Sequence, residues 1–181
     1  MRKLLIILGM PGSGKDTQIA ELCKRREAHV IRVGDLVREK AKTDPQIAKD
    51  LEKGDLVDDQ MVNDLIESTI NNTSKNAFII SDGFPRDINQ AMWFEQFLKQ
   101  NDVELENIML LDVEEEVALK RLLKRGRDDD EEQTIRHRLD VFKQETGEVV
   151  DYYSTRSNFL RIDGNGTPSE VLQQMREKLS W

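Results

Sequence analysis

The chain has 181 residues, of which 38% are hydrophobic and 34% charged, a balance that suits one folded domain rather than a disordered chain. The 35 acidic residues outnumber the 27 basic ones and give a net charge of −8, so neither nucleic acid nor an anionic membrane is an expected partner. The longest apolar run, residues 4–8, is far shorter than the ~20 residues that span a bilayer. It carries no cleavage-site pattern, and the single cysteine, Cys23, fits a reducing compartment, so we expect a cytoplasmic protein. The chain has two histidines in addition to that cysteine, and the spacing of these three residues does not suggest a structural zinc site.

Five short apolar runs alternate with longer helical patterns along the chain. The runs are continuous, as expected for strands covered on both faces, and lie at residues 3–8, 29–33, 77–81, 108–113 and 159–162. Between them, apolar residues three and four apart predict amphipathic helices. This alternation predicts an α/β fold with a five-stranded parallel sheet and helices on both faces, whose ligands bind at the carboxyl ends of the strands.

One segment between the second and third runs is too long for a single crossover. Residues 34–73 hold two or three helical patterns. We therefore interpret residues 33–61 as a small helical insertion in a single domain that spans residues 1–181.

A glycine-rich segment, GMPGSGKDTQ, follows the first apolar run at residues 9–18. Gly9, Gly14 and Lys15 match the G-x-x-x-x-G-K core of a phosphate-binding P-loop, between a predicted strand and a predicted helix. Such a loop turns backbone N–H groups and the positive end of the helix dipole toward phosphates, and Lys15 can reach them. Because strand and helix are both in register, we favour this interpretation over an incidental glycine turn. The generic pattern has Ser or Thr after the lysine, whereas here Asp16 precedes Thr17.

A second motif, FIISDGFPRDINQ, covers residues 78–90. The apolar strand ends in Asp82, whose carboxylate could organise Mg²⁺ and its water, or could cap a turn. The guanidinium fork of Arg86 suits a dianionic phosphate, whereas an ordinary surface arginine is unfavourable at the start of a helix.

A group of arginines in residues 120–139 forms a third signal. Arg121 and Arg125 share a helix face without an acid three or four residues before them. Like charges at this spacing repel by about 0.2–0.5 kcal/mol, so a bound anion explains them better than solvation. Arg138 also has no acid at helical spacing, whereas Arg136 has Glu132 and is expected to form a surface pair.

Taken in order, these motifs resemble the nucleoside monophosphate kinases, and the short-lid adenylate kinases in particular, over essentially the whole chain. The resemblance implies a monomeric P-loop enzyme that transfers the γ-phosphoryl group of ATP reversibly to AMP, giving two ADP, with Mg²⁺ as cofactor. It implies a lid at residues 125–131 and a cis bond between Phe84 and Pro85. The implied catalytic residues are Lys15, Arg86, Arg125, Arg127 and Arg138, and the metal-side residues are Thr17 and Asp82, acting largely through water. The implied ATP-binding residues are Gly12, Ser13, Gly14, Lys15, Asp16, Thr17, Arg121, Arg125 and Gly166. The implied AMP-binding residues are Val33, Gly34, Arg38, Asp55, Leu56, Val57, Gly83, Phe84, Arg86, Gln90, Arg127 and Arg138.

Two departures from the family pattern keep alternatives open. Asp16 stands where glycine is usual, and we interpret it as a first-turn acid that points away from the phosphates. Arg32 and Val33 stand where Ser-Thr is usual, which bears on base selectivity. Gln90, at the position that reads adenine, favours AMP. A UMP/CMP kinase is the first alternative and a non-catalytic nucleotide-binding module the second.

Overall fold

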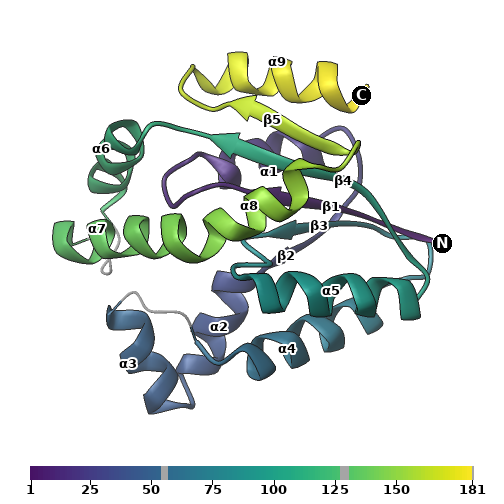
Figure 1. The fold of residues 1–181 in the computed structure, drawn as a ribbon, viewed down its shortest axis with the longest axis horizontal. Helices are drawn as coiled ribbons and strands as arrows, with labels where there is room; N and C mark the ends of the chain where they lie inside the picture. Colours follow the sequence, from purple (N-terminus) through teal and green to yellow (C-terminus); the bar gives the residue numbers. More distant parts are fainter. Residues whose placement is uncertain (54–56, 127–130, 181) are drawn as a thin grey trace.

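The computed structural model describes residues 1–53, 57–126 and 131–180, in which five parallel strands form one sheet (Figure 1). The strand order is β2-β3-β1-β4-β5. The strands are β1 (Arg2–Leu8), β2 (His29–Arg32), β3 (Phe78–Asp82), β4 (Val103–Asp112) and β5 (Phe159–Asp163). The predicted α/β class and the five-stranded parallel sheet are confirmed. The main difference is at β4, which begins at Val103 rather than near residue 108.

Helices cover both faces of this sheet because β1 alternates its buried side chains between two apolar clusters. On one face, Leu5 and Ile7 pack with α1 (Lys15–Cys23) and α9 (Pro168–Leu179). On the other face, Leu4 and Ile6 belong to a cluster that includes α4 (Asp59–Asn71), α5 (Ile88–Gln100) and α8 (Gly147–Ser154). The strands run toward the side of Figure 1 where α6, α7 and α2 gather, so the carboxyl edge of the sheet faces those helices.

The segment predicted as an insertion is helical. It contains α2 (Val33–Ala41), α3 (Pro45–Lys53) and the beginning of α4, and α2 contacts both α3 and α4. Val33 was expected at the end of a strand, but it begins α2 and is buried against the main core. Within the described ranges, no helix is both long and apolar enough to cross a membrane.

The arginine-rich region forms two helices that pack on each other. α6 (Glu115–Arg125) contacts α7 (Glu132–Val141) through a small apolar cluster that includes Leu122 and Leu139. A π-helical segment, η1 (Phe142–Thr146), joins α7 directly to α8. Four residues of the expected lid, 127–130, lie outside the described residues.

Candidate active site

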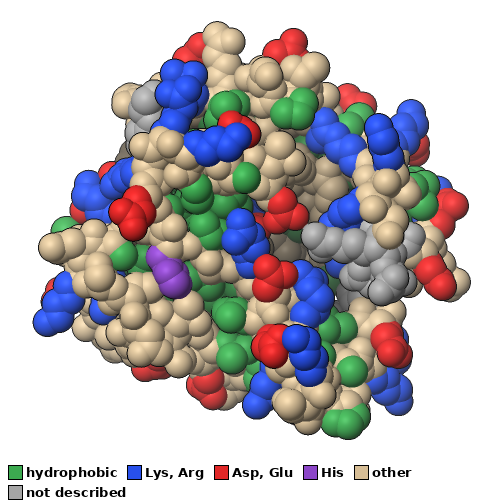
Figure 2. All heavy atoms as spheres, turned by 180° about the vertical axis from the view of Figure 1, so that it is seen from behind, with side chains coloured by type: hydrophobic (Ala, Val, Ile, Leu, Met, Phe, Trp, Pro, Cys, Tyr) green, Lys and Arg blue, Asp and Glu red, His purple; other side chains and the backbone are tan. Residues whose placement is uncertain are grey.

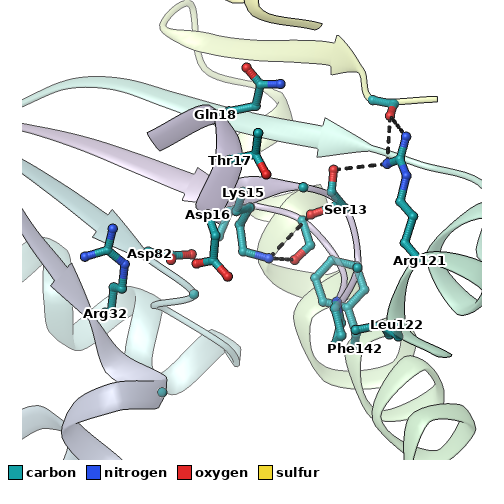
Figure 3. A pocket seen from close by; sticks show the side chains of 18 of the residues that line it. Ser13, Lys15, Asp16, Thr17, Gln18, Arg32, Asp82, Arg121, Leu122 and Phe142 are labelled. Atoms are coloured by element: carbon teal, nitrogen blue, oxygen red, sulfur yellow. Dashed lines mark hydrogen bonds between the residues drawn. The ribbon is translucent and has the colours of Figure 1, made fainter. Parts of the chain in front are cut away.

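A cavity of about 730 Å³ opens at the carboxyl edge of the sheet, between the loop after β1, the end of β3 and helices α2, α6 and α7. Figure 2 shows basic and acidic side chains mixed over the face seen there, and Figure 3 shows the lining from close by. Most of the residues predicted from the sequence meet in this lining. They are Gly12, Ser13, Gly14, Lys15, Asp16, Thr17, Gly34, Arg38, Asp82, Gly83, Arg86, Arg121, Arg125, Arg138 and Gly166.

The glycine loop packs tightly against α6. Gly12 has a φ of +81°, and a Cβ built on it would lie 2.5 Å from the carbonyl oxygen of Ala118. Gly14, at the N-cap of α1, has a φ of +94° with nothing within 4 Å of such an atom. The two glycines therefore serve different purposes: Gly12 allows close packing, while Gly14 allows the left-handed turn into the helix.

The ammonium group of Lys15 folds back over the loop that precedes it (Figure 3). It donates to the carbonyl of Gly9 at 2.5 Å and to that of Met10 at 3.3 Å, and contacts the Ser13 hydroxyl at 3.5 Å. Burial lowers the pKa of Lys15, while the carboxylates of Asp82 and Asp16 act in the opposite direction. The ammonium group of Lys15 is thus held beside the backbone N–H groups of the loop, where it can bind the phosphates of a ligand.

Asp82 brings a nearly buried carboxylate to the same cavity at the end of β3. The residue is 8% exposed, and burial raises its pKa. Its carboxylate accepts no hydrogen bond from the residues that the structure describes. The interpretation of Asp16 as an acid pointing away from the phosphate site is wrong, because Asp16 lines the cavity and Figure 3 shows its carboxylate turned toward Asp82. The negative charge of Asp16 also contributes to the raised pKa of Asp82.

Three arginines gather on the other side of the cavity. Burial lowers the pKa of Arg86, and the positive charges of Arg138 and Arg38 add to that effect. The Nε of Arg86 donates to the carbonyl of Gly83 at 3.0 Å, which aims the guanidinium across the end of β3. Arg38 pairs with Asp35 at 2.5 Å, the local pair that the helix spacing allows. Three cations held this close favour an anionic ligand, because each raises the cost of ionising the others.

Arg121 has partners that the local sequence rule does not consider. Its guanidinium donates twice to the carbonyl of Gly164 at 3.0 Å and reaches the carbonyls of Gly166 at 3.2 Å and Ser13 at 3.4 Å. It therefore ties the P-loop to the loop after β5 (Figure 3). The expected surface pair of Arg136 with Glu132 is confirmed, at 2.8 Å.

Some predicted residues lie behind the lining rather than in it. Phe84 is fully buried and makes edge contacts with the rings of Trp93 and Phe94, and its bond to Pro85 is cis, as expected. Val33 is buried, and Val57 packs against the same core cluster. Gln90 is also buried, directly behind Arg86. Asp55, Leu56 and Arg127 lie outside the described residues.

Arg32 and Thr146 are among the lining residues that were not singled out as site residues from the sequence. Arg32 lines the cavity, and its positive charge lowers the pKa of Asp82. Its place could have been found from the sheet register, because Arg32 pairs with Asp82 at the carboxyl edge. Thr146 also lines the cavity and donates to the carbonyl of Arg86 at 2.7 Å. No sequence signal marks Thr146, because the π-helical segment that places it does not follow α-helical spacing.

The described residues contain no group of three or more His, Cys, Asp and Glu side chains that could hold a metal ion. Thr17, Asp82 and Asp16 line the cavity. Carboxylate and hydroxyl oxygens suit a hard cation that keeps most of its water, which needs few protein ligands.

The fold and this cavity define a class. A parallel sheet with a glycine loop between β1 and α1, facing a cluster of arginines, is typical of P-loop proteins that act on phosphorylated ligands.

Comparison with known proteins gives the particular family. The family model described as "Adenylate kinase" matches residues 7–158. The chain is 36% identical to adenylate kinase 1 of Nostoc sp. (strain PCC 7120) over 179 residues, which cover 97% of each chain. It is 36% identical to the adenylate kinase of Thermus thermophilus over 183 residues, 97% of this chain and 96% of the relative. It is 33% identical to the adenylate kinase of Prochlorococcus marinus (strain MIT 9211), with 99% and 98% covered. The chain therefore belongs to the adenylate kinase family.

Proposed function

We propose that this protein transfers the γ-phosphoryl group of ATP reversibly to AMP, giving two molecules of ADP. The observation that carries the proposal is one cavity that holds both the P-loop with Lys15 and the arginine cluster around Arg86. A donor and an acceptor phosphate can therefore meet between them. Family membership supports the same reaction.

The donor site would be formed by the P-loop and α6. Backbone N–H groups of the loop and the start of α1 would hold the ATP phosphates, and Lys15 would move from the loop carbonyls onto them. Arg121 holds the loop at Gly164–Gly166 against the P-loop, and would shape the adenine side of the donor site. The proposed ATP-binding residues are Gly12, Ser13, Gly14, Lys15, Asp16, Thr17, Arg121, Arg125 and Gly166.

The acceptor site would be formed by α2, the end of β3 and the first turn of α5. The guanidinium groups of Arg38 and Arg86 would bind the phosphate of AMP, because a fork of N–H donors matches a phosphate dianion. The ion pair between Arg38 and Asp35 would break, and Arg38 would bind that phosphate instead. Nearer the base, the proposed residues are Val33, Gly34, Asp55, Leu56, Val57, Gly83, Phe84 and Gln90.

The reaction needs no side-chain base, because the attacking oxygen of AMP is already ionised at neutral pH. Catalysis then consists of holding the two phosphates in line and stabilising the charge that is shared in the transition state. The cations proposed for this are Lys15, Arg86, Arg125, Arg127 and Arg138. Closure of the lid at 125–131 over the phosphates would exclude water, which would otherwise compete with AMP.

Magnesium is part of the proposal. The buried carboxylate of Asp82, without a hydrogen-bond donor among the described residues, and the hydroxyl of Thr17 fit a hydrated Mg²⁺ that they would hold largely through water. When bound with ATP, the ion neutralises part of the charge on the phosphates. The monomeric state, the cytoplasmic location and the lack of structural zinc remain predictions.

An ADP-forming assay with Mg-ATP and each natural nucleoside monophosphate in turn tests the proposal. AMP should have the largest kcat/KM. The largest kcat/KM for CMP or UMP would instead support the pyrimidine nucleotide kinase, and binding of ATP without ADP formation from any acceptor would support a non-catalytic module.

A further inference from the structure

The side-chain amide of Gln90 is clamped from two sides. Its Oε1 accepts a hydrogen bond from the backbone N–H of Arg86 at 2.9 Å, and its Nε2 donates to Oδ1 of Asp59 at 2.7 Å. Gln90 is 2% exposed, so water does not compete strongly for either bond. Asp59 comes from the first turn of α4, 31 residues away in the chain.

This clamp fixes which way the amide faces. A backbone N–H can only donate and an ionised carboxylate can only accept. Turning the amide by 180° would place its NH₂ group against the N–H of Arg86 and its oxygen against the carboxylate of Asp59. Both hydrogen bonds would then be replaced by repulsive contacts between buried polar groups, which is costly.

The clamp leaves one donor and one acceptor of the amide unused. An amide carries two N–H donors and two oxygen lone pairs, and the clamp uses one of each. The six-membered ring of adenine presents an amino donor at position 6 and an acceptor at N1. A 6-oxopurine, such as hypoxanthine, presents the reverse order at the same two atoms. For one pose of the base, an amide of fixed orientation therefore matches only one of the two.

We infer that Asp59 is a positioning residue for base selection, which holds the Gln90 amide in the orientation that accepts adenine and rejects 6-oxopurines. The inference rests on the proposed function, in which Gln90 reads the base of AMP. Without Asp59, only the N–H of Arg86 would oppose the flipped amide. A site built to pair with one arrangement of donors and acceptors loses selectivity when its own groups can turn.

Asp59 has no need to cap its own helix. The N-cap of α4 is Asp58, which accepts from the N–H of Met61 at 2.9 Å. The other acid beside the clamp, Asp87, caps α5 by accepting from the backbone N–H of Gln90 at 3.0 Å. Burial and the neighbouring carboxylate of Asp59 raise the pKa of Asp87. Because Asp87 is used in capping α5, Asp59 is the acid whose carboxylate accepts the hydrogen bond from the Gln90 amide.

The test compares AMP with IMP, whose bases differ only in the groups at positions 6 and 1. We would measure kcat/KM for both acceptors in the wild type, Asp59→Ala, Asp59→Asn and Gln90→Ala. Asp64→Ala is the matched control, because Asp64 accepts the same kind of bond from Gln60 at 2.7 Å on the exposed side of the same helix. One well-oriented pair of hydrogen bonds discriminates between bases by about 1–3 kcal/mol, or about 5- to 150-fold.

We expect Asp59→Ala to reduce the AMP/IMP ratio at least about tenfold, chiefly through a higher KM for AMP and a lower KM for IMP. Asp59→Asn keeps a carbonyl acceptor and should retain most of the ratio, and Asp64→Ala should leave it unchanged. A purely structural contribution of Asp59 would change thermal stability or kcat without changing this ratio. If Asp59→Ala does not fold, Asp59→Ser, which is too short to reach the amide, replaces it.

The outcomes separate this inference from the proposed function. An unchanged ratio in Asp59→Ala, together with a lost preference in Gln90→Ala, would overturn the inference alone. An unchanged ratio in Gln90→Ala as well would show that Gln90 does not read the base, and would overturn the inference with that part of the proposal. A wild type that does not phosphorylate AMP would overturn the proposed function itself.

Discussion

Gly12 and Gly14 allow the packing of the P-loop against α6 to be measured apart from the backbone strain of the loop. Both have positive φ, so an alanine at either position adopts a left-handed conformation that costs roughly 1–2 kcal/mol. The Cβ of Gly14→Ala would meet nothing within 4 Å, whereas that of Gly12→Ala would lie 2.5 Å from the Ala118 oxygen and 2.9 Å from Cγ of Leu122. The Ala118 carbonyl belongs to the backbone of α6 and cannot rotate away as a side chain would. We therefore expect Gly12→Ala to lose about 1–3 kcal/mol more than Gly14→Ala, the usual cost of overpacking.

The assay is thermal or urea unfolding of the two variants without nucleotide, so that effects on phosphate binding do not enter. For a chain of this size, 1 kcal/mol corresponds to about 2–4 °C in Tm. Gly12→Ala should therefore unfold about 2–12 °C below Gly14→Ala. The effect of the added methyl on the unfolded chain is common to both variants and cancels in the comparison. Equal Tm values, or a lower Tm for Gly14→Ala, would refute the claim that α6 constrains the P-loop through Gly12.

Three further predictions concern the charged side chains of the cavity. Because burial raises the pKa of Asp82, its charged form destabilises the fold above that pKa. Asp82→Asn should therefore have a higher Tm than the wild type at pH 7, and this difference in Tm should shrink as the pH falls toward 4. The same substitution should abolish activity. A lower Tm of Asp82→Asn at pH 7 would contradict this prediction. Asp16→Gly removes a carboxylate turned toward Asp82, and should raise the Mg²⁺ concentration needed for half-maximal activity; an unchanged Mg²⁺ dependence would show that Asp16 is not part of the metal side. Arg86→Ala should lower kcat as well as kcat/KM for AMP, because its bond to phosphate strengthens in the transition state, whereas Arg136→Ala, which breaks an exposed pair, should change kcat/KM by less than about twofold.

The fold was largely predictable because buried parallel strands leave a plain signal. The continuous apolar runs located all five strands of the described sheet, and among these strands β4 alone was placed too short by more than one residue. Its first residues include Glu104 and Glu106, which interact with Lys3 at the sheet surface. Charged residues there hide the strand from a search for apolar runs, although Lys3 and Glu104 are neighbours in the register of β1 and β4.

The chemistry-bearing residues were predictable from motifs, but their partners were not. The motifs placed Lys15, Asp82 and Arg86 at one edge of the sheet, where the structure has them. The carbonyls of Gly164 and Gly166 that hold Arg121 lie 43 and 45 positions further along the chain, and Asp59 is 31 positions from Gln90. Spacing rules treat only neighbours on one helix, so contacts made by the folding of distant loops escape them. The direction of the Asp16 side chain was missed for the same reason. An acid in the first turn of a helix interacts favourably with the helix dipole whichever way it points, so its position in the helix does not show that it faces a second carboxylate across the cavity.

Incubation of the protein with Mg²⁺ and ADP as the only nucleotide tests the central claim most directly. We predict that ATP and AMP appear in equal amounts until equilibrium is reached, because one ADP can occupy each side of the same cavity and a phosphoryl group can pass between them. The same experiment with Arg86→Ala should proceed much more slowly. Stable ADP, or formation of AMP and inorganic phosphate without ATP, would contradict the claim that this cavity joins two adenine nucleotides for phosphoryl transfer.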